Sequence, residues 1–239
     1  MEKLTPKYKR VLIKLSGEAL AGKAGHGLDN EVIGSVVEEI KKIHDAGVQV
    51  ALVIGAGNFW RGRQGREMDR STADYMGMLA TVMNSLAMME ALERAGMPAR
   101  VQSAISMPAV TETYVLKQTL HHLEKGRVVI IAGGTGHPYC STDTAAALRA
   151  SEIQADMLLM AKNVDGIYDS DPKLNPKAKK YDHISYIDII KNGIKAMDLT
   201  AATMCMENGI PALAFALDEK DSLIKAVCGG KIGTLIDNK

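Results

Sequence analysis

The chain has 239 residues, 46% of them hydrophobic, and its 29 Lys and Arg almost balance 28 Asp and Glu, which leaves a net charge of +1. A chain of this length buries one substantial core, and the charge balance excludes a global attraction to nucleic acid or to an anionic membrane. Cys140, Cys205 and Cys228 are widely spaced and form no Cys-x-x-Cys pattern, which favours free thiols over a disulfide framework or a zinc site. The apolar run after the basic N-terminus is broken at Lys14. It is therefore too short for a signal peptide or a membrane span, and we expect a cytoplasmic protein.

Strand and helix patterns alternate along the chain with no sign of a linker. Apolar runs predict strands, and apolar residues at helical spacing predict helices. In chain order the predicted elements are strand Arg10–Leu15, helix 30–46, strand 48–54, helix 71–95, strand 99–102, helix 110–124, strand 127–132, helix 142–152, strand 156–161, helix Tyr186–Asn192, helix 198–208, strand 211–216 and a last edge strand at 232–236. This alternation predicts an α/β fold, one domain over residues 1–239 in which helices cover both faces of a mostly parallel sheet, as in an αβα three-layer sandwich.

Three predicted strands each end in a glycine turn, namely Lys14-Leu-Ser-Gly17, Gly55-Ala-Gly57 and Gly133-Gly-Thr-Gly136. Backbone amides at the carboxyl ends of parallel strands bind phosphate, so the turns predict a site for several phosphates. Neither a Walker A motif nor a Gly-x-Gly-x-x-Gly motif opens the first helix. The first turn carries a lysine, the second precedes Asn-Phe-Trp-Arg-Gly and the third precedes a Thr-Asp pair. Together these features indicate phosphoryl transfer.

Five segments resemble, in order and spacing, the bacterial uridylate (UMP) kinases of the amino-acid-kinase fold family. They are residues 14–20, 54–62, 74–84, 135–143 and 164–172. The last segment is shared by the wider fold family, which includes acetylglutamate kinase, aspartokinase and carbamate kinase, whereas residues 74–84 are particular to the UMP kinases. The resemblance covers the chain from about Tyr8 to the C-terminus, and it implies an amino-acid-kinase-like fold.

The resemblance also implies the substrates and the residues that bind them. ATP and UMP are the expected partners, with Mg²⁺ held mainly by the nucleotide phosphates and no metal-ligating residue of the protein. We expect residues 1 to about 150 to form the acceptor-nucleotide lobe, and residues from about 151 to 239 to form the ATP lobe. The expected catalytic residues are Lys14, Arg61 and Asp143; the expected ATP-binding residues are Lys14, Leu15, Ser16, Gly17, Gly57, Arg61, Asn163, Tyr168 and Asp171; and the expected UMP-binding residues are Ala56, Asp74, Thr135, Gly136, His137, Pro138, Tyr139, Cys140, Ser141 and Thr142.

Several of these residues have a structural interpretation as well. Lys14 lies within an apolar strand, where a buried ammonium requires an anionic partner, either a substrate phosphate or a structural ion pair. Arg61 follows Phe59 and Trp60, which hold its stem while its guanidinium reaches a phosphate. The alternative, a solvated basic loop, fits Arg63, Arg66 and Arg70 better than Arg61.

Asp74 is open to two interpretations, because it either caps a helix or pairs with the helix dipole, or it accepts hydrogen bonds from the ribose hydroxyls of the acceptor, as the resemblance implies. Asp171 before Pro172 is alternatively a turn cap, and Asp198 is either a helix N-cap or a neighbour of the lysine. Lys162 and Asn163 compete for the first adenine contact.

This sequence departs from the family at three site positions. Ala56 replaces the middle glycine of a three-glycine turn, which requires a backbone angle that a Cβ tolerates. His137 and Cys140 replace an Asn and an aromatic residue. Lone His and Cys residues suggest a metal or a nucleophile, but kinases of this type need neither, so we expect His137 to hydrogen-bond the pyrimidine.

The predicted activity is ATP plus UMP giving ADP plus UDP, in pyrimidine nucleotide synthesis. Another kinase of this fold, acting on a carbamate, carboxylate or isopentenyl phosphate, is one alternative, and a nucleotide-binding storage or regulatory protein without turnover is a second. The resemblance ties a glycine-rich loop, formed by Gly22, Lys23, Ala24, Gly25, His26 and Gly27, to activation by GTP, with UTP as a further effector. A flexible loop without regulatory use is the alternative.

The helix at residues 71–95 predicts self-association. Met76, Leu79, Met83 and Leu86 form one apolar stripe, and Met78, Val82, Met88 and Met89 widen the apolar surface beyond what one sheet face covers. We expect the excess to be buried in a subunit contact. The resemblance implies a homohexamer built from dimers.

Overall fold

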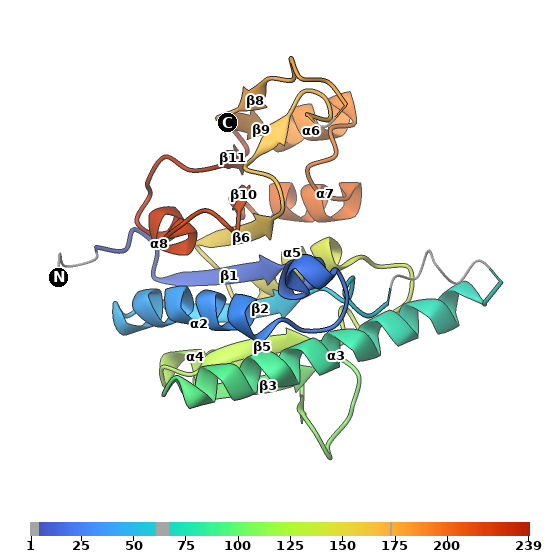
Figure 1. Ribbon diagram of the computed structural model, residues 1–239, viewed down its shortest axis with the longest axis vertical. Coiled ribbons are helices and arrows are strands. Elements are labelled where there is room, and N and C mark those ends of the chain that lie inside the picture. The colour runs from blue at the N-terminus through green and yellow to red at the C-terminus, as the bar shows by residue number, and fades with distance from the viewer. Residues whose placement is uncertain (1–4, 61–66, 173) are drawn as a thin grey trace.

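A single nine-stranded sheet forms the middle of the molecule (Figure 1), and its strand order is β4-β3-β5-β2-β1-β6-β10-β11-β9. The computed structural model describes residues 5–60, 67–172 and 174–239. The strands of this sheet are β1 (Arg10–Leu15), β2 (Gln49–Ile54), β3 (Ala99–Ser103), β4 (Glu112–Thr113), β5 (Val128–Ala132), β6 (Met157–Lys162), β9 (His183–Ser185), β10 (Ala212–Ala216) and β11 (Thr234–Asp237). Neighbouring strands are parallel except for β10 and β11. The predicted, mostly parallel sheet is therefore confirmed.

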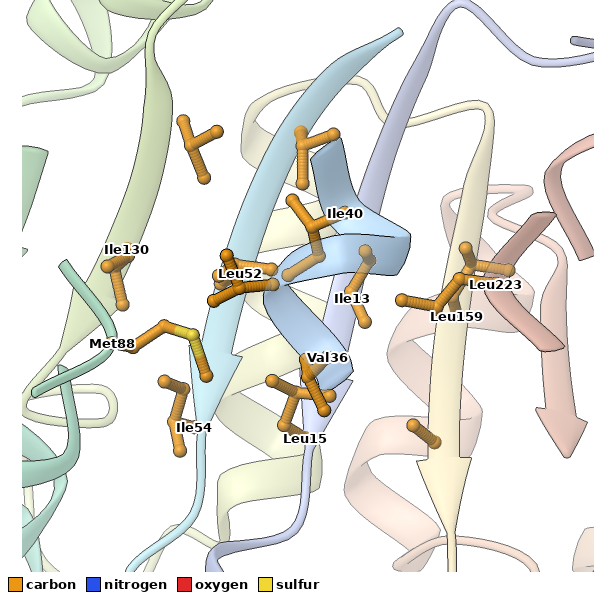
Figure 2. Close-up of a cluster of buried hydrophobic side chains, with 14 of the residues drawn as sticks. Ile13, Leu15, Val36, Ile40, Leu52, Ile54, Met88, Ile130, Leu159 and Leu223 are labelled. Atoms are coloured by element: carbon orange, nitrogen blue, oxygen red, sulfur yellow. The ribbon is translucent and has the colours of Figure 1, made fainter. Parts of the chain in front are cut away.

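Helices cover both faces of the sheet, which gives the three layers expected from the sequence. The helices are α1 (Gly17–Leu20), the 3-10 turn η1 (Gly22–Ala24), α2 (Asn30–Asp45), α3 (Arg70–Arg94), α4 (Leu116–Glu124), α5 (Thr142–Glu152), α6 (Tyr186–Asn192), α7 (Leu199–Glu207) and α8 (Ser222–Val227). Helices α2, α3 and α8 enclose one apolar core with the sheet, part of which is drawn in Figure 2. Helices α4 to α7 enclose a second core on the opposite face. None of the helices within the described residues combines the length and apolar character that crossing a bilayer requires.

Strand β1 shows how the sequence places a charged side chain at the edge of a buried sheet. Ile13 and Leu15 point into the core formed with α2 and α3, whereas Leu12 belongs to the opposite core. Because side chains alternate along a strand, Lys14 shares the face of Leu12, one step from the carboxyl end. The lysine therefore emerges beside α5, where the strand ends.

Two element predictions are wrong. The helix predicted at 110–124 begins only at Leu116, and Glu112–Thr113 instead forms the edge strand β4 beside β3. Residues 110–115 are rich in β-branched side chains, which favour extended backbone. The strand predicted at 232–236 is present as β11, but it is not an edge, because it lies between β10 and β9.

Short elements escaped prediction because they contain too few residues to show a period. They are α1, η1, α8, the edge strand β9 and the hairpin of β7 (Ile167–Tyr168) with β8 (Lys180–Tyr181). The hairpin lies in the turn-rich region between β6 and β9.

Candidate functional site

A cavity of about 730 Å³ opens at the carboxyl ends of three adjacent strands, β5, β2 and β1. All three glycine turns follow these strands, which brings segments more than 100 residues apart in the sequence to one edge of the sheet. The predicted site residues that line this cavity are Lys14, Ala56, Gly57, Asp74, Tyr139, Cys140, Ser141, Thr142 and Asp143. The predicted residues of the catalytic and acceptor sites thus largely share one space.

An ion pair between Lys14 and Asp143 lies in this cavity. The Nζ–Oδ1 distance is 3.0 Å, and 14% of the lysine side chain and 20% of the aspartate side chain remain exposed. Asp143 occupies the first turn of α5, whose N-cap is Ser141. Its Oδ1 is buried and makes no hydrogen bond to any described residue, so the contact with Lys14 is a charge interaction without hydrogen-bond geometry. That oxygen retains the capacity to accept a hydrogen bond or to ligate a cation.

A second lysine approaches the same pair from β6. Lys162 donates a hydrogen bond from Nζ to the carbonyl oxygen of Ala196. Burial lowers the pKa of Lys162 and the nearby Lys14 lowers it further, while Asp143 opposes the shift. Two ammonium groups therefore lie near one carboxylate in this region, while Glu18, Asp74 and Asp198 add further carboxylates to the cavity lining.

Asp74 faces the cavity from the second turn of α3. Its Oδ2 accepts hydrogen bonds from Arg70 Nε at 2.9 Å and from the backbone N–H of Tyr139 at 2.9 Å. The N-cap of α3 is Asp69, whose side chain accepts from the backbone of Thr72. The capping interpretation of Asp74 is therefore wrong, and its carboxylate is directed at the loop that follows β5.

Arg70 is a site residue that the sequence pattern placed in a solvated basic loop. It lines the cavity, pairs with Asp74 and lies 5.5 Å from the ring centroid of Tyr139. Tyr139 itself adopts a left-handed φ of 69° with 70% of its surface exposed. A left-handed backbone is uncommon for an aromatic residue and marks a conformation fixed by its surroundings, here by the bond to Asp74.

Asp198 is the N-cap of α7, and it also lines the cavity that Lys14 lines. It caps α7 by accepting from the backbone N–H of Ala201 at 2.8 Å. It also accepts from the hydroxyl of Ser141 and from that of Thr144, the latter at 3.0 Å, and it lines the cavity. The capping bond and the hydroxyl bonds together tie the start of α5 to the start of α7.

Backbone geometry explains why Ala56 is tolerated in the second glycine turn. The non-glycine residues with a left-handed backbone are Tyr139, Gln154 and Asp221 among the described residues, so Ala56 avoids the region that a Cβ disfavours. Its carbonyl oxygen accepts the backbone N–H groups of Phe59 and Trp60, both at 2.9 Å. The turn thus forms with a methyl group in place of the usual glycine hydrogen.

Other predicted residues lie outside the cavity lining. Leu15 is fully buried in the core. Ser16 is the N-cap of α1, which begins at Gly17. The turn after β5 contains Thr135, Gly136, His137 and Pro138, and Thr135 Oγ1 accepts a hydrogen bond from the backbone N–H of His137. Asn163, Tyr168 and Asp171 lie in or beside the hairpin region after β6, and Tyr168 donates its hydroxyl to Asp165 at 2.7 Å. Arg61 lies outside the described residues.

The glycine-rich loop formed by Gly22, Lys23, Ala24, Gly25, His26 and Gly27 lies beside the second glycine turn, although it does not line the cavity. The ring of His26 meets that of Phe59 edge to face at 5.9 Å. The backbone N–H of Gly27 donates to the carbonyl of Asn58 at 3.1 Å. The loop is thus bonded to the residue that follows residues 55–57.

Several further lining residues are not among the predicted catalytic and substrate-binding residues. They include Glu18, Trp60, Gly77, Met78, Thr81, Gly134, Thr144 and Thr200. Trp60 donates its indole N–H to the carbonyl of Ala73, a long-range contact that leaves no local pattern. Glu18 lies within the recognised segment 14–20, and Thr144 lies directly after the segment 135–143, so both were within reach of the motifs.

Comparison with known proteins decides the family. The model of the amino acid kinase family matches residues 9–215. The chain belongs to the amino acid kinase family. Within this family it is similar to a solved UMP kinase from Bacillus anthracis, with 39% identity, a TM-score of 0.95 and 98% of each chain covered.

Two further solved structures extend the comparison. A UMP kinase from Ureaplasma parvum is 38% identical with a TM-score of 0.91, covering 97% of this chain and all of the other. A uridylate kinase from Archaeoglobus fulgidus is 29% identical with a TM-score of 0.73, covering 95% of this chain and 99% of the other. The similarity to these three solved structures therefore extends over nearly the whole chain.

Proposed function

We propose that the protein is a UMP kinase that transfers the γ-phosphoryl group of ATP to UMP and releases ADP and UDP. The observation that carries the proposal is that one cavity joins the Lys14–Asp143 pair to Asp74, in a chain that matches two solved UMP kinases over nearly its full length. Pyrimidine nucleotide synthesis in the cytoplasm is the corresponding setting.

Charge neutralisation and alignment supply the catalysis. Lys14 contacts the moving phosphoryl group and the donor phosphates, where the transition state spreads negative charge. Arg61 adds a second cation through a bidentate contact. No general base is needed, because the second pKa of a phosphate monoester is about 6 and the acceptor is largely dianionic at neutral pH. Asp143 holds Lys14 in place.

Mg²⁺ bound together with ATP would supply neutralisation of charge on the phosphates. The buried Asp143 Oδ1, which accepts no hydrogen bond from a described residue, suits a water molecule of the Mg²⁺ shell or the ion itself. No group of three or more His, Cys, Asp or Glu side chains suited to a metal occurs among the described residues. We assign the ion mainly to the nucleotide phosphates, with Asp143 as the protein carboxylate beside it.

The two substrates occupy opposite sides of the ion pair. We assign UMP to the lobe of residues 1–150, with Asp74 accepting from the ribose hydroxyls and the 135–142 loop contacting phosphate and uracil. We assign ATP to the lobe of residues 151–239, where Asn163, Tyr168 and Asp171 face adenine and ribose and the 14–17 and 55–57 turns bind phosphate. We assign Lys162 to the phosphates as well, since its ammonium group interacts with the charges of Asp143 and Lys14.

Assembly into a homohexamer built from dimers completes the proposal. An exposed apolar surface on α3, which we call the α3 stripe, comprises Tyr75, Met76, Leu79 and Met83. An apolar surface of this kind on a helix is suited to a subunit contact. GTP and UTP are the proposed effectors, with the 22–27 loop as the responding segment.

A coupled ADP-release assay with Mg²⁺ and ATP tests the activity against UMP, CMP, dTMP, carbamate and acetylglutamate. Turnover with UMP well above the other acceptors supports the proposal. Turnover with carbamate or acetylglutamate alone would instead indicate another kinase of this family, and ATP binding without ADP release would indicate a regulatory protein.

The effector assignment is tested by adding saturating GTP to the same assay. If the kinetics for UMP and ATP do not change, GTP is not an effector of this protein.

A further inference from the structure

We propose that Thr81 and Asn84 of α3, with Asn58, are positioning residues that hold the second and third glycine turns at the separation that phosphoryl transfer requires. The proposal rests on the proposed kinase activity and adds residues to its machinery. None of the three side chains carries a charge that acts on phosphate, and two of them, Asn58 and Asn84, do not line the cavity. They act instead by hydrogen-bonding backbone groups in or beside the glycine turns, which they hold in place.

Asn84 and Asn58 form a reciprocal amide pair beneath the second glycine turn, at residues 55–57. Asn58 Nδ2 donates to Asn84 Oδ1 at 2.9 Å, and Asn84 Nδ2 donates to Asn58 Oδ1 at 2.8 Å. Asn84 Nδ2 also donates to the carbonyl of Gly55 at 2.7 Å, and Asn58 Nδ2 donates to the carbonyl of Gly27 at 2.7 Å. Both side chains are buried. A fully hydrogen-bonded buried amide pair fixes the backbone that it contacts, because each lost bond leaves an unpaired polar group.

Thr81 fastens the third glycine turn, at residues 133–136, from the preceding helical turn of α3. Its Oγ1 accepts the backbone N–H of Gly133 at 2.9 Å and donates to the carbonyl of Met78 at 2.6 Å. Because the hydroxyl hydrogen is used within the helix, its oxygen is oriented to receive Gly133. Gly133 has a left-handed φ of 74°, so the orientation of its amide determines how the turn begins.

Residues three positions apart lie on the same face of a helix. One helical turn of α3 therefore holds both glycine turns at once, through Thr81 on one and Asn84 on the other. Strands β2 and β5, which precede these turns, are direct neighbours in the sheet. If these side chains only stabilised the fold, it would be enough that their polar groups are paired. The hydrogen bonds of Thr81 and Asn84 also fix the distance between the turns at residues 55–57 and 133–136, which are proposed to bind different phosphates. Small misplacements of reacting groups cost large factors in rate.

The experiment compares Thr81→Val, which keeps the shape and removes the hydroxyl, with Thr81→Ser, which restores the hydroxyl. Asn84→Ala is the second, independent variant. Thr119→Val is the matched control, because Thr119 is a buried threonine whose hydroxyl donates to Gln102 on the opposite face of the sheet, away from the cavity. For each full-length protein, kcat and KM for UMP and ATP are measured below the melting temperature, which is recorded in parallel.

Positioning predicts that kcat falls about tenfold or more in Thr81→Val and Asn84→Ala, since misalignment acts on the transition state. Thr81→Ser recovers most of the loss, and Thr119→Val lowers thermal stability but keeps the wild-type kcat. Three results would overturn the proposal, because each would show that the network serves the fold alone. They are a wild-type kcat in both site variants, a loss of kcat that only follows the unfolded fraction, and failure of both variants to fold. A wild type that does not phosphorylate UMP rejects the proposed activity instead. The ratios of variant kcat to wild-type kcat are then measured with the acceptor that the wild type does phosphorylate.

Discussion

Lys14 reaches the cavity because it occupies the penultimate position of a buried strand, and Asp143 meets it because α5 begins after the third glycine turn. The sequence predicts both placements, since the end of a strand and the first turn of a helix are readable from local patterns. Arg70 and the hydroxyl bonds of Asp198 were not predictable in this way. Those contacts depend on how segments distant in the chain approach one another, which no local period records.

Replacing Lys14 by Met tests its proposed role as the cation beside the moving phosphoryl group. We expect kcat to fall about a hundredfold or more, in the range measured when one transition-state donor is removed from an enzyme. Steady-state kinetics with UMP and ATP give the result. Lys41→Met is the control, because Lys41 pairs with Asp45 on the exposed surface of α2, and an equal loss in that variant would contradict a specific role for Lys14.

Asp74 should distinguish ribose from deoxyribose. If its carboxylate accepts a bond from the 2′-hydroxyl, the wild type prefers UMP over dUMP in kcat/KM by about 10-fold to 100-fold, since an unpaired buried acceptor costs about 1–3 kcal/mol. Asp74→Ala removes the acceptor and should bring the two substrates close to equality, with a smaller change in the KM for ATP. An undiminished preference for UMP in Asp74→Ala would place ribose recognition elsewhere.

At the level of elements, segments with a clear apolar pattern were predicted well, including the short α6 and β10, whereas most elements of two to four residues were not. Helices α2 and α3 and the five strands β1, β2, β3, β5 and β6 appear within a few residues of their expected bounds, because each contains enough apolar residues to show a period. The segment at 110–124 was misassigned, since an apolar pattern continues from an edge strand into α4. The partner of β11 was missed because β9 has only three residues.

The contact between the first two glycine turns makes Gly17 a sensitive position. A Cβ on Gly17 would come within 2.4 Å of the Gly55 carbonyl oxygen and 2.6 Å of Asn58 Oδ1. Gly17→Ala must push the turns apart, and we expect a loss of stability of about 1–3 kcal/mol from overpacking and a loss of kcat/KM of about tenfold or more. Thermal denaturation and kinetics measure the two effects.

Gly34→Ala is the matched control for that substitution. Gly34 lies inside α2, and a Cβ at this position would meet no neighbouring atom of the described residues within 4 Å. An alanine there should stabilise the protein by about 0.5–1 kcal/mol, because glycine loses more backbone entropy in a helix, and activity should not change. Normal turnover and stability in Gly17→Ala would show that the two turns separate without consequence.

For the whole molecule, the exposed side of α3 differs from the one that the pattern suggested. Met78, Val82 and Met88 are buried against the sheet, whereas Met76, Leu79 and Met83 of the first stripe are 36%, 44% and 53% exposed. An apolar helix offers no polar face to indicate which side meets the core. The expected excess of apolar surface is present, and the α3 stripe carries it.

The mass of the particle in solution tests whether the protein assembles through the α3 stripe. Light scattering at micromolar concentration should give a hexamer for the wild type and a smaller particle for Leu79→Glu, since a charge buried in an apolar contact is costly. Ile187→Glu is the control: Ile187 is as exposed as Leu79, at 44%, but lies on α6. A monomeric wild type would contradict the assembly, and an equal effect of both substitutions would contradict its assignment to α3.

The central claim is that the cavity transfers a phosphoryl group from ATP to UMP with Lys14 as the essential cation. The most direct measurement incubates the protein with Mg²⁺, UMP and ATP labelled at the γ-phosphate, and separates the nucleotide products. The account predicts that the label appears in UDP, in step with the ADP released, and that Lys14→Met almost abolishes its appearance. ADP release without labelled UDP, or undiminished UDP formation by Lys14→Met, would contradict it.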